Sequence, residues 1–466
     1  MNGPTQSENV LEGLQPNSNL KKLCISCYRG SKFSTWMKDS LLPNLVEISL
    51  ENCRRYEHLP PLGNLPYLKV LFLTGNHIVK YLGNEFYGDS AIVFPSLESL
   101  ELCDMTNLEE WRTVNGKESF PHLRTLLMAG CSRLEEFPII PSVTSFTIRR
   151  SNAKLLCSVK NLTSLSFLAI EYFDKLTLLP DVLLQNHKML VSLRIYYLCE
   201  LESLANQLNS LSAMKYLEIS YCNKLQSLPE GIQKLRCLQS LHILCCYRFA
   251  SFQMFGFGGL SSLRKLWIEK CEAFCSLSEG IQYLTALEEL CLDKCPKLIS
   301  LPEGIQHLTN LRTLQIWNCD RLSALPTQIG CLTSLSYLAI EYCSSLMSIP
   351  DEMQNLRTLK TLLIRECPHL KRRCKKGSGV DWHKIAHIPN IQTYFWRPWD
   401  FWEVFWKLRF CYVIQGWTHI GTTLLPFCER NLFLLPFFEW WIELAAFLSL
   451  YSYFYFPPKR GYFFVH

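Results

Sequence analysis

The 466-residue sequence lacks the motifs by which nucleotide-binding and membrane-spanning proteins are usually detected. No phosphate-binding loop of the form G-x-x-x-x-G-K-[ST] occurs, because the pair Gly116-Lys117 has neither the upstream glycine nor the following hydroxyl residue. The apolar stretch 444–456 carries no charge but has only 13 residues, whereas a membrane-spanning helix needs about 20. A nucleotide site is therefore not expected, and length alone does not indicate a membrane span.

The sequence also offers no set of residues that predicts catalysis or metal binding. A nucleophile, a base and an orienting group cannot be placed together from their spacing, so we expect no enzyme activity and no cofactor. Cys367, Cys374, His383 and His387 have the residue types of a zinc site, but the cysteines are seven residues apart, which favours a structural role. The 47 basic and 41 acidic residues nearly cancel, so nucleic-acid binding is not expected either.

Signals for secretion are scarce as well. The chain does not open with a basic segment followed by an apolar stretch, so no signal peptide is expected. Only Asn161-Leu-Thr163 matches the glycosylation pattern N-x-[ST]. We therefore expect a cytoplasmic protein whose 22 cysteines are mostly reduced, with disulfides as the alternative state and a nuclear or membrane-associated protein as the alternative location.

What the sequence contains instead is a repeat. Residues 211–222 and 308–319 follow one template, L-x-x-L-x-x-L-x-L-x-x-C. The final cysteine recurs every 24 or 25 residues at Cys222, Cys246, Cys271, Cys295, Cys319, Cys343 and Cys367, a period typical of leucine-rich repeats. Including more divergent copies, we count fifteen repeats, whose seventh-position apolar residues are Leu23, Ile48, Leu71, Leu100, Leu126, Phe146, Leu168, Leu193, Leu217, Leu241, Leu266, Leu290, Leu314, Leu338 and Leu362.

The alternation within the template predicts the fold. In L-x-L the two apolar side chains lie on one side of a short strand and the middle side chain on the other. One copy is too small to bury its apolar side alone, so neighbouring copies should stack into a continuous core beneath a parallel sheet. Leu-Pro follows the strand at residues 228–229, 301–302 and 325–326, and proline cannot donate to a sheet ladder, so these segments belong to the other side. We therefore expect an α/β leucine-rich-repeat solenoid, a horseshoe with a parallel β-sheet on its concave face and loops or short helical turns on its convex face.

The template divides the chain into four regions: a lead-in (residues 1–19), the repeats (residues 20–370), a C-terminal cap (residues 371–392) and an aromatic-rich tail (residues 393–466). In the cap, Trp382, Ile385 and Ile388 are expected to cover the last repeat. The tail has 26 aromatic residues among the 73 from position 394 onward and follows no template. We expect it to be unstructured or to contact a membrane.

Most of the net charge of +6 lies in one basic cluster, formed by Lys371, Arg372, Arg373, Lys375 and Lys376. A solvated end of the solenoid is the simplest interpretation of such a cluster. A nuclear-import signal and a contact with an acidic partner are the alternatives.

Several segments resemble a known family. Residues 41–53, L-L-P-N-L-V-E-I-S-L-E-N-C, and residues 58–71, H-L-P-P-L-G-N-L-P-Y-L-K-V-L, are similar to the repeat region of plant disease-resistance proteins of the coiled-coil, nucleotide-binding, leucine-rich-repeat (NBS-LRR) class. The opening residues 10–23 and the closing residues 367–370 and 381–389 resemble the two ends of that region. The resemblance covers about residues 9–392.

This resemblance implies a recognition module of plant defence that binds a protein, either a pathogen effector or a guarded host protein, on its concave surface. Members of the class carry a nucleotide-binding domain ahead of the repeats, so the chain resembles the recognition half without its switch. It is expected to be a fragment or to work with a nucleotide-binding domain of another chain. The alternative is a membrane-associated leucine-rich-repeat receptor or regulator that is anchored by the aromatic tail.

The candidate contact residues flank the two apolar positions of each strand and are expected to point away from the core. In the resembled family these positions carry recognition, and Tyr and Trp are favoured as contact anchors. The alternative is that some of them only stack on one another along the sheet. The predicted partner-binding residues are Glu171, Tyr172, Arg194, Tyr196, Tyr197, Tyr216, Glu218, Tyr221, Trp267, Glu269, Asp293, Trp317, Tyr337, Glu341 and Tyr342.

Overall fold

The computed structural model describes residues 4–37, 41–112, 118–204, 208, 210–252, 257–393 and 463–465. The chain divides into two units, of which one comprises Met1–Thr393 with Phe463–His466 and the other Tyr394–Tyr462. The second unit, which contains almost all of the predicted tail, lies outside the described residues. The described fold is therefore that of the first unit.

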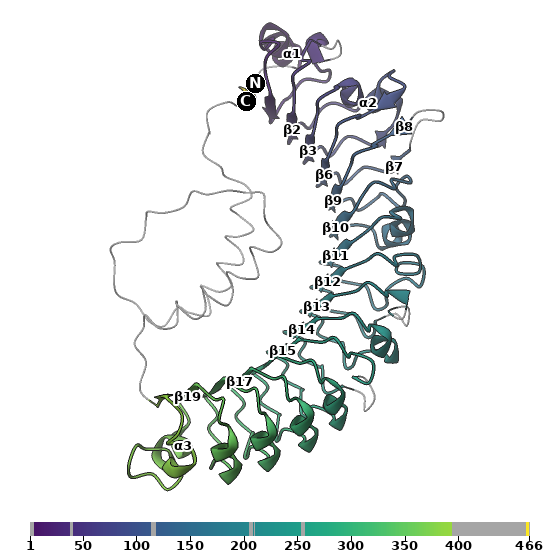
Figure 1. The fold of residues 1–466 in the computed structure, drawn as a ribbon. Coiled ribbons are helices and arrows are strands. Elements are labelled where there is room, and N and C mark those ends of the chain that lie inside the picture. The colour runs from purple at the N-terminus through teal and green to yellow at the C-terminus, as the bar shows by residue number, and fades with distance from the viewer. Residues whose placement is uncertain are drawn as a thin grey trace, which may run out of the picture. The chain divides into compact units, whose positions relative to one another are not determined.

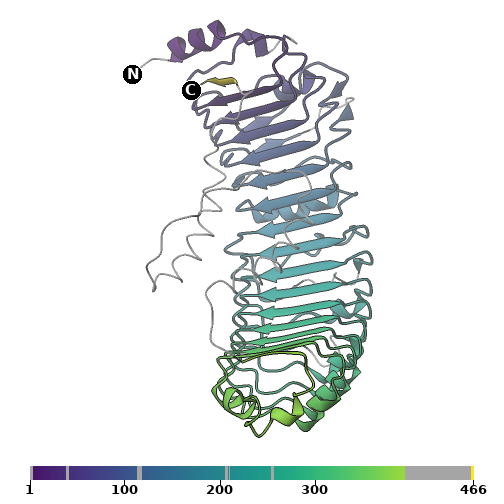
Figure 2. The same ribbon diagram turned by 60° about the vertical axis from the view of Figure 1, so that its left-hand side comes forward.

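Each predicted repeat contributes one strand of five residues to a single parallel sheet, and neighbouring strands pair in register. Figure 1 shows these strands on the inner side of an arc, and Figure 2 shows them as successive rungs. The strands are β1 (Lys22–Ser26), β2 (Glu47–Glu51), β3 (Val70–Thr74), β6 (Ser99–Cys103), β9 (Thr125–Ala129), β10 (Ser145–Arg149), β11 (Phe167–Glu171), β12 (Ser192–Tyr196), β13 (Tyr216–Ser220), β14 (Ser240–Leu244), β15 (Lys265–Glu269), β16 (Glu289–Asp293), β17 (Thr313–Trp317), β18 (Tyr337–Glu341) and β19 (Thr361–Arg365). The predicted α/β leucine-rich-repeat solenoid is confirmed.

Shorter elements complete the fold. At the ends of the sheet, β20 (Asn390–Gln392) pairs with β19 and β21 (Phe463–Val465) pairs with β1. Two small parallel pairs join β4 (Tyr81–Leu82) to β7 (Glu110–Trp111) and β5 (Ile92–Val93) to β8 (Glu118–Ser119). The helices are α1 (Pro4–Gly13), α2 (Asn84–Tyr87) and α3 (Pro368–Arg373), and the 3-10 turns are η1 (Thr35–Met37), η2 (Leu62–Asn64), η3 (Ala153–Asn161), η5 (Glu230–Lys234), η6 (Glu279–Tyr283), η7 (Glu303–His307), η8 (Thr327–Cys331), η9 (Asp351–Asn355) and η10 (Trp382–Lys384).

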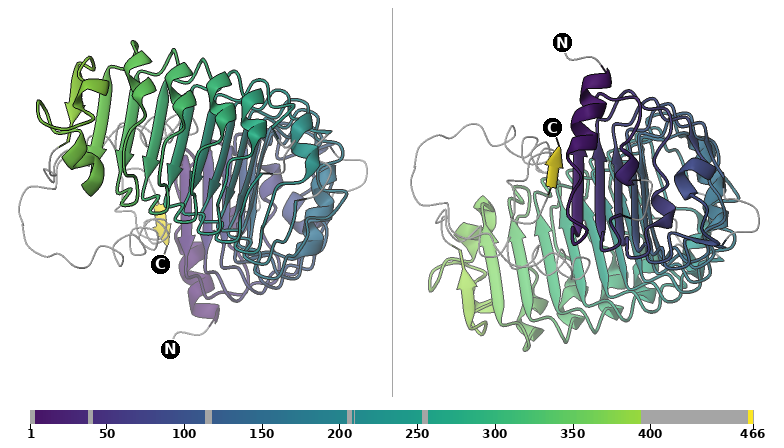
Figure 3. Two further views of the ribbon diagram at one scale, coloured as in Figure 1. Left: turned by 90° about the horizontal axis from the view of Figure 1, so that it is seen from below. Right: turned by 90° about the horizontal axis from the view of Figure 1, so that it is seen from above.

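The core is built from apolar columns that run along the solenoid. Leu266 and Ile268 of β15 are fully buried and pair with the equivalent Leu and Ile of β14 and Leu of β16. On the outer side, prolines such as Pro302 and Pro326 precede the 3-10 turns with φ of −70°, a value that the proline ring favours. Figure 3 shows these turns along the convex side of the C-terminal repeats. The template therefore positions a rigid sheet on one face and short turns on the other.

Where a repeat carries the template cysteine, the thiol usually contacts a carbonyl of the previous strand. The Cys319 thiol lies 3.8 Å from the Leu292 carbonyl oxygen and the Cys343 thiol 3.7 Å from that of Ile316, and both side chains are fully buried. In the third repeat Asn76 takes this place, and its amide nitrogen donates to the Leu50 carbonyl at 3.0 Å. These thiols are free, and burial raises the pKa of Cys53 to about 12. The column therefore satisfies buried backbone carbonyls, with a thiol as the usual donor.

A left-handed residue follows each of the fifteen repeat strands. Its φ lies between 46° and 66°, and in the first fourteen repeats its N–H donates to the carbonyl of the last residue of the next repeat strand, as from Tyr197 to Ser220 at 2.9 Å. The left-handed conformation turns this N–H back toward the neighbouring strand, so the sheet gains one more hydrogen bond per repeat. The fifteen residues are Cys27, Asn52, Gly75, Asp104, Gly130, Arg150, Tyr172, Tyr197, Tyr221, Cys245, Lys270, Lys294, Asn318, Tyr342 and Glu366.

The N-terminal end of the solenoid is covered by α1. Glu8 accepts hydrogen bonds from the N–H groups of Ser31 and Lys32, at 2.7 and 3.2 Å. Glu12 accepts from the Ser34 hydroxyl at 2.6 Å, and the Trp36 indole donates to the Leu11 carbonyl at 3.0 Å. Figure 3 shows α1 at this end and α3 at the other. These bonds tie part of the predicted lead-in to the first repeat.

The C-terminal end is closed by α3 and the segment that follows it. Ile385 and Ile388 are buried, and Trp382 packs partly buried against the core, as a cap over the last repeat requires. The helix α3 begins at Pro368, three residues before the first residue of the predicted cap, Lys371. The strand β20 was not anticipated, because residues 390–392 carry no L-x-L pattern.

Candidate functional site

The concave face consists of the outward-pointing side chains of the strands and of the left-handed residues that follow them. All fifteen predicted contact residues lie on it, and none is buried. Four of them, Tyr172, Tyr197, Tyr221 and Tyr342, stand just beyond the strand ends with φ between 54° and 59°. The other eleven lie within strands and are Glu171, Arg194, Tyr196, Tyr216, Glu218, Trp267, Glu269, Asp293, Trp317, Tyr337 and Glu341.

Four tyrosines from three neighbouring repeats form the tyrosine cluster: Tyr172, Tyr196, Tyr197 and Tyr221. The ring centroids of Tyr172 and Tyr197 are 5.1 Å apart, and those of Tyr197 and Tyr221 are 5.3 Å apart. The Arg150 guanidinium lies 5.6 Å from the centroid of the Tyr172 ring, where a cation–π attraction operates. The stacking considered from sequence is therefore present in this cluster. Tyr197 still exposes 39% of its surface.

The surroundings of Tyr196 and Tyr221 keep these two phenols protonated. Burial raises the pKa of Tyr221 to about 12, and the nearby Tyr172 and Tyr221 side chains add to the effect of burial in raising the pKa of Tyr196 well above its ordinary value. Neutral phenols can both donate and accept hydrogen bonds. The tyrosine cluster therefore combines an apolar body with polar edges, which suits contact with a protein surface.

A second group lies in the middle column of the next strands. The Arg194 Nε and the Glu218 Oε2 are 3.2 Å apart, and the His242 ring stacks on Trp267 with centroids 4.9 Å apart and planes inclined by 13°. The His242 Nε2 lies 2.9 Å from the Ser240 hydroxyl. Desolvation lowers the pKa of His242 to about 4. Near neutral pH the face therefore presents a neutral imidazole beside the indole.

Towards the C-terminal repeats, Trp317 is flanked by carboxylates on both neighbouring strands. Its partners in register are Asp293 and Glu341. Burial raises the pKa of both carboxyl groups, while an Asn318 amide at 2.8 Å and the Arg365 guanidinium at 3.9 Å oppose this effect for Asp293 and Glu341 respectively. Within the described residues the Trp317 Nε1 is buried and has no acceptor.

Three concave-face residues were missed from the sequence. Arg149 ends β10, in register with Glu171, and Arg150 is the cation above the Tyr172 ring. His242 holds the position of Trp267 in the preceding strand. The template itself identifies their positions, but the prediction did not include them. Their roles depend on neighbours in adjacent repeats.

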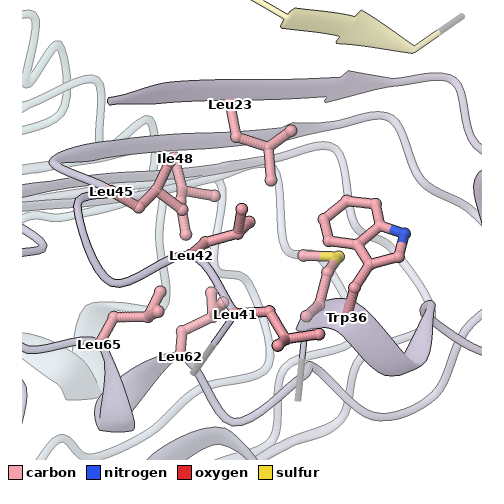
Figure 4. Close-up of a pocket in the computed structure, with 9 residues that line it drawn as sticks. Leu23, Trp36, Leu41, Leu42, Leu45, Ile48, Leu62 and Leu65 are labelled. Atoms are coloured by element: carbon pink, nitrogen blue, oxygen red, sulfur yellow. The ribbon is translucent and has the colours of Figure 1, made fainter. Parts of the chain in front are cut away.

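The described residues contain no cluster of side chains arranged to bind a metal ion. No group of three or more His, Cys, Asp or Glu side chains among them is placed to hold a metal ion. Cys367 and Cys374 are buried, whereas His383 and His387 are exposed. A pocket beneath the first repeats (Figure 4) is apolar, and its lining residues are Leu23, Trp36, Met37, Leu41, Leu42, Leu45, Ile48, Leu62 and Leu65. None of these side chains supplies a general acid, a base or a nucleophile.

Comparison with known proteins agrees with the repeat assignment. The family model of R13L1/DRL21 leucine-rich repeats matches residues 1–76. The chain is 33% identical over 200 residues to the RGA1 disease resistance protein of Solanum bulbocastanum, across 43% of this chain and 20% of that protein. It is 35% identical over 186 residues to Disease resistance protein RGA2 of the same species, across 37% and 19%. The matched part therefore spans about a fifth of the length of these relatives.

Solved structures share the fold at low sequence identity. The structure of the Toll–Spatzle complex of Drosophila matches 85% of this chain and 53% of that chain, with 16% identity and a TM-score of 0.52. Such a likeness supports the solenoid fold alone. The family model and the resistance-protein relatives supply the repeat type. The chain is therefore a leucine-rich-repeat protein whose repeats are similar to those of plant NBS-LRR disease resistance proteins.

Proposed function

We propose that this chain is a non-enzymatic recognition module of plant defence, which binds a pathogen effector or a guarded host protein through its concave face. The observation that carries the proposal is the tyrosine cluster with the flanking Trp267 and Trp317, all half-buried or exposed on one sheet. Tyr, Trp and Arg are the residue types that supply most binding energy in protein interfaces. The disease resistance relatives support the biological setting.

The scaffold suits this role because it holds the contact residues rigidly. Backbone hydrogen bonds fix each of the fifteen repeat strands on both sides, and the left-handed residues of the first fourteen repeats each add one more bond. A side chain that is already ordered loses little conformational entropy on binding. The Arg194–Glu218 pair and the Asp293 and Glu341 carboxylates supply polar groups around the aromatic ones. Such a mixture matches the apolar centre and polar surroundings of protein interfaces.

A triple substitution tests the proposal. The variant Trp267→Ala, Trp317→Ala and Tyr342→Ala removes three aromatic side chains from the concave face. The chain, immobilised through an added affinity tag, is incubated with leaf extract from challenged and unchallenged plants, and the captured proteins are quantified by mass spectrometry. We expect proteins captured by the wild-type chain to be lost with the variant, while its circular dichroism spectrum stays unchanged.

A matched control uses Tyr67, Tyr81 and Tyr283, which expose 59%, 49% and 47% of their surface and lie outside the concave strands. Their replacement by Ala should leave capture unchanged. Equal capture by the concave variant and the wild-type chain would show that the concave face is not the binding surface. Loss of capture with the control alone would assign binding to another face.

We further propose that the chain acts in the cytoplasm, with a nucleotide-binding domain supplied by another chain. The free thiols of its described cysteines support a reducing compartment. The alternative of a membrane-associated receptor or regulator depends on residues 393–466, of which all but 393 and 463–465 lie outside the described residues. Among the residues that the structure describes, no helix has the length and apolar character needed to cross a bilayer. Cell fractionation distinguishes the two, since the alternative requires detergent for extraction.

A further inference from the structure

The C-terminal cap carries most of the net charge of the molecule. Residues 371–384 contain six basic residues and one acidic residue, a net charge of +5, while the whole chain has +6. The remainder of the chain is therefore almost neutral in sum. A cationic patch of this kind attracts anionic surfaces over a distance of about 10 Å at moderate salt.

Two of these cations, Arg373 and Lys384, form ion pairs within the folded cap. The Arg373 guanidinium donates to both carboxylate oxygens of Asp381, at 2.6 and 3.1 Å. The Lys384 ammonium lies 2.9 Å from Asp381 and 2.8 Å from Asp351, and it donates to the Ile349 carbonyl at 2.8 Å. Asp381 is 1% exposed. These pairs hold the cap on the last repeat and do not face solvent as free charge.

The other four cations point outward and form the cap patch: Lys371, Arg372, Lys375 and Lys376. All four are exposed. Within the described part of the chain, Arg372, Lys375 and Lys376 form no ion pair with an acidic side chain. The charges of Arg372, Lys375 and Lys376 are therefore available to a partner.

The backbone of the cap fixes the patch in place. The N–H of Gly379 donates to the Lys375 carbonyl at 2.8 Å and that of Asp381 to the Arg373 carbonyl at 2.9 Å. Gly377 takes a φ of 75°, and a Cβ on Gly379 would stand 2.1 Å from the Arg373 oxygen. The loop after α3 therefore returns tightly to the helix that carries Lys371 and Arg372. Val380, 63% exposed, ends this loop.

We propose that the cap patch binds the anionic headgroup surface of a membrane. Three lysines act as point charges that need no directional acceptor, and each basic residue near such a surface contributes to binding. The exposed Val380 beside them can enter the interfacial region, which favours a lipid surface over a purely ionic partner. The fold also argues against an extended import signal, because Lys371 and Arg372 lie within α3. This surface is separate from the concave face and does not depend on the function proposed for that face.

Vesicle co-flotation of the full chain tests the proposal. Vesicles of phosphatidylcholine with about 30 mol% phosphatidylserine are compared with pure phosphatidylcholine, each at about 50 mM and about 500 mM NaCl. The test variant is Lys371→Gln, Arg372→Gln, Lys375→Gln and Lys376→Gln. We expect the serine-lipid-dependent partition of the wild-type chain to fall at least about 50-fold in this variant and to fall with salt.

The matched control removes four exposed cations elsewhere, through Lys160→Gln, Lys188→Gln, Lys234→Gln and Arg236→Gln. It has the same net charge as the test variant and should retain the partition. Equal binding of every chain to both lipid compositions would overturn the proposal. Binding that does not require phosphatidylserine would come from apolar adsorption and not from the charge of the cap patch. Selective binding to a DNA duplex instead of the vesicles, or equal loss in both variants, would also overturn it.

Discussion

The half-buried imidazole of His242 makes the stability of the central repeats depend on pH. Desolvation is the main cause that lowers its pKa to about 4, with Lys265 acting in the same direction and Glu218 against it. Because the folded chain resists protonation of His242 while the unfolded chain accepts a proton near pH 6.5, stability falls as the pH drops from about 6.5 towards about 4. The full difference corresponds to about 3 kcal/mol, of which about 2 kcal/mol is lost by about pH 5.

Other groups contribute to the same range, so the effect must be isolated by difference. The buried His187 also has a lowered pKa, from desolvation, and acts in the same direction. Glu171, Asp293 and Glu341 have raised pKa values and act in the opposite direction, since protonation then favours the folded state. The variant His242→Phe keeps a ring against Trp267 but cannot titrate. The difference between the wild-type chain and this variant in the pH-dependent loss of unfolding free energy therefore reports the titration of His242 alone.

The assay is urea unfolding followed by tryptophan fluorescence at about pH 7.5 and about pH 5, for the wild-type chain, His242→Phe and His187→Phe. We expect the wild-type chain to lose about 2 kcal/mol more than His242→Phe between the two pH values. The His187→Phe variant serves as the control, because it should keep the part of the pH dependence due to His242. Identical losses for the wild-type chain and His242→Phe, or an NMR titration of His242 near its ordinary value, would refute the reasoning.

Three further predictions concern the backbone, the cap and nucleotide. Replacing Gly75 by Ala should cost about 1–3 kcal/mol in thermal unfolding, because its φ is 66° and a Cβ would stand 2.4 Å from the Asn52 Oδ1; an unchanged midpoint would contradict this. Asp381→Ala should destabilise the C-terminal repeats by about 2–4 kcal/mol, because it leaves Arg373 and Lys384 without their shared carboxylate. Amide hydrogen exchange in β18 and β19 measures this loss. Unaltered protection of these amides would show that the ion pairs of Asp381 do not stabilise the last repeats. The chain should show no saturable binding of ATP or ADP in calorimetry, since no phosphate-binding loop is present in its sequence.

Much of the fold is predictable from the sequence because the repeat acts through spacing alone. The buried positions Leu217, Leu241 and Leu266 follow from one template, and stacking then requires a parallel sheet in register. The cysteine column follows from the same spacing. By contrast, the left-handed conformation of Tyr197 is not readable from its side chain, because glycine or asparagine is the usual occupant of such a position.

The candidate site is only partly predictable for a related reason. The template gives the direction of each strand side chain, so all fifteen predicted residues lie on the concave face. It does not give the neighbours across repeats, which create the His242–Trp267 stack and the Arg150–Tyr172 contact. Nor does it indicate that Asp381 pairs with Arg373, because that contact depends on the turn after α3. The local sequence pattern determines on which face a side chain lies, whereas its ionisation and burial depend on contacts with neighbouring repeats.

Hydroxyl-radical footprinting of the chain with its captured partner tests the central claim most directly. If the concave face is the recognition surface, oxidation of Tyr196, Tyr197 and Trp317 should fall several-fold on binding, since contact excludes water from interface centres. The exposed Tyr67 and Tyr283 should be oxidised as in the free chain. Protection of Tyr67 or Tyr283 with unchanged oxidation of the concave residues would contradict the account.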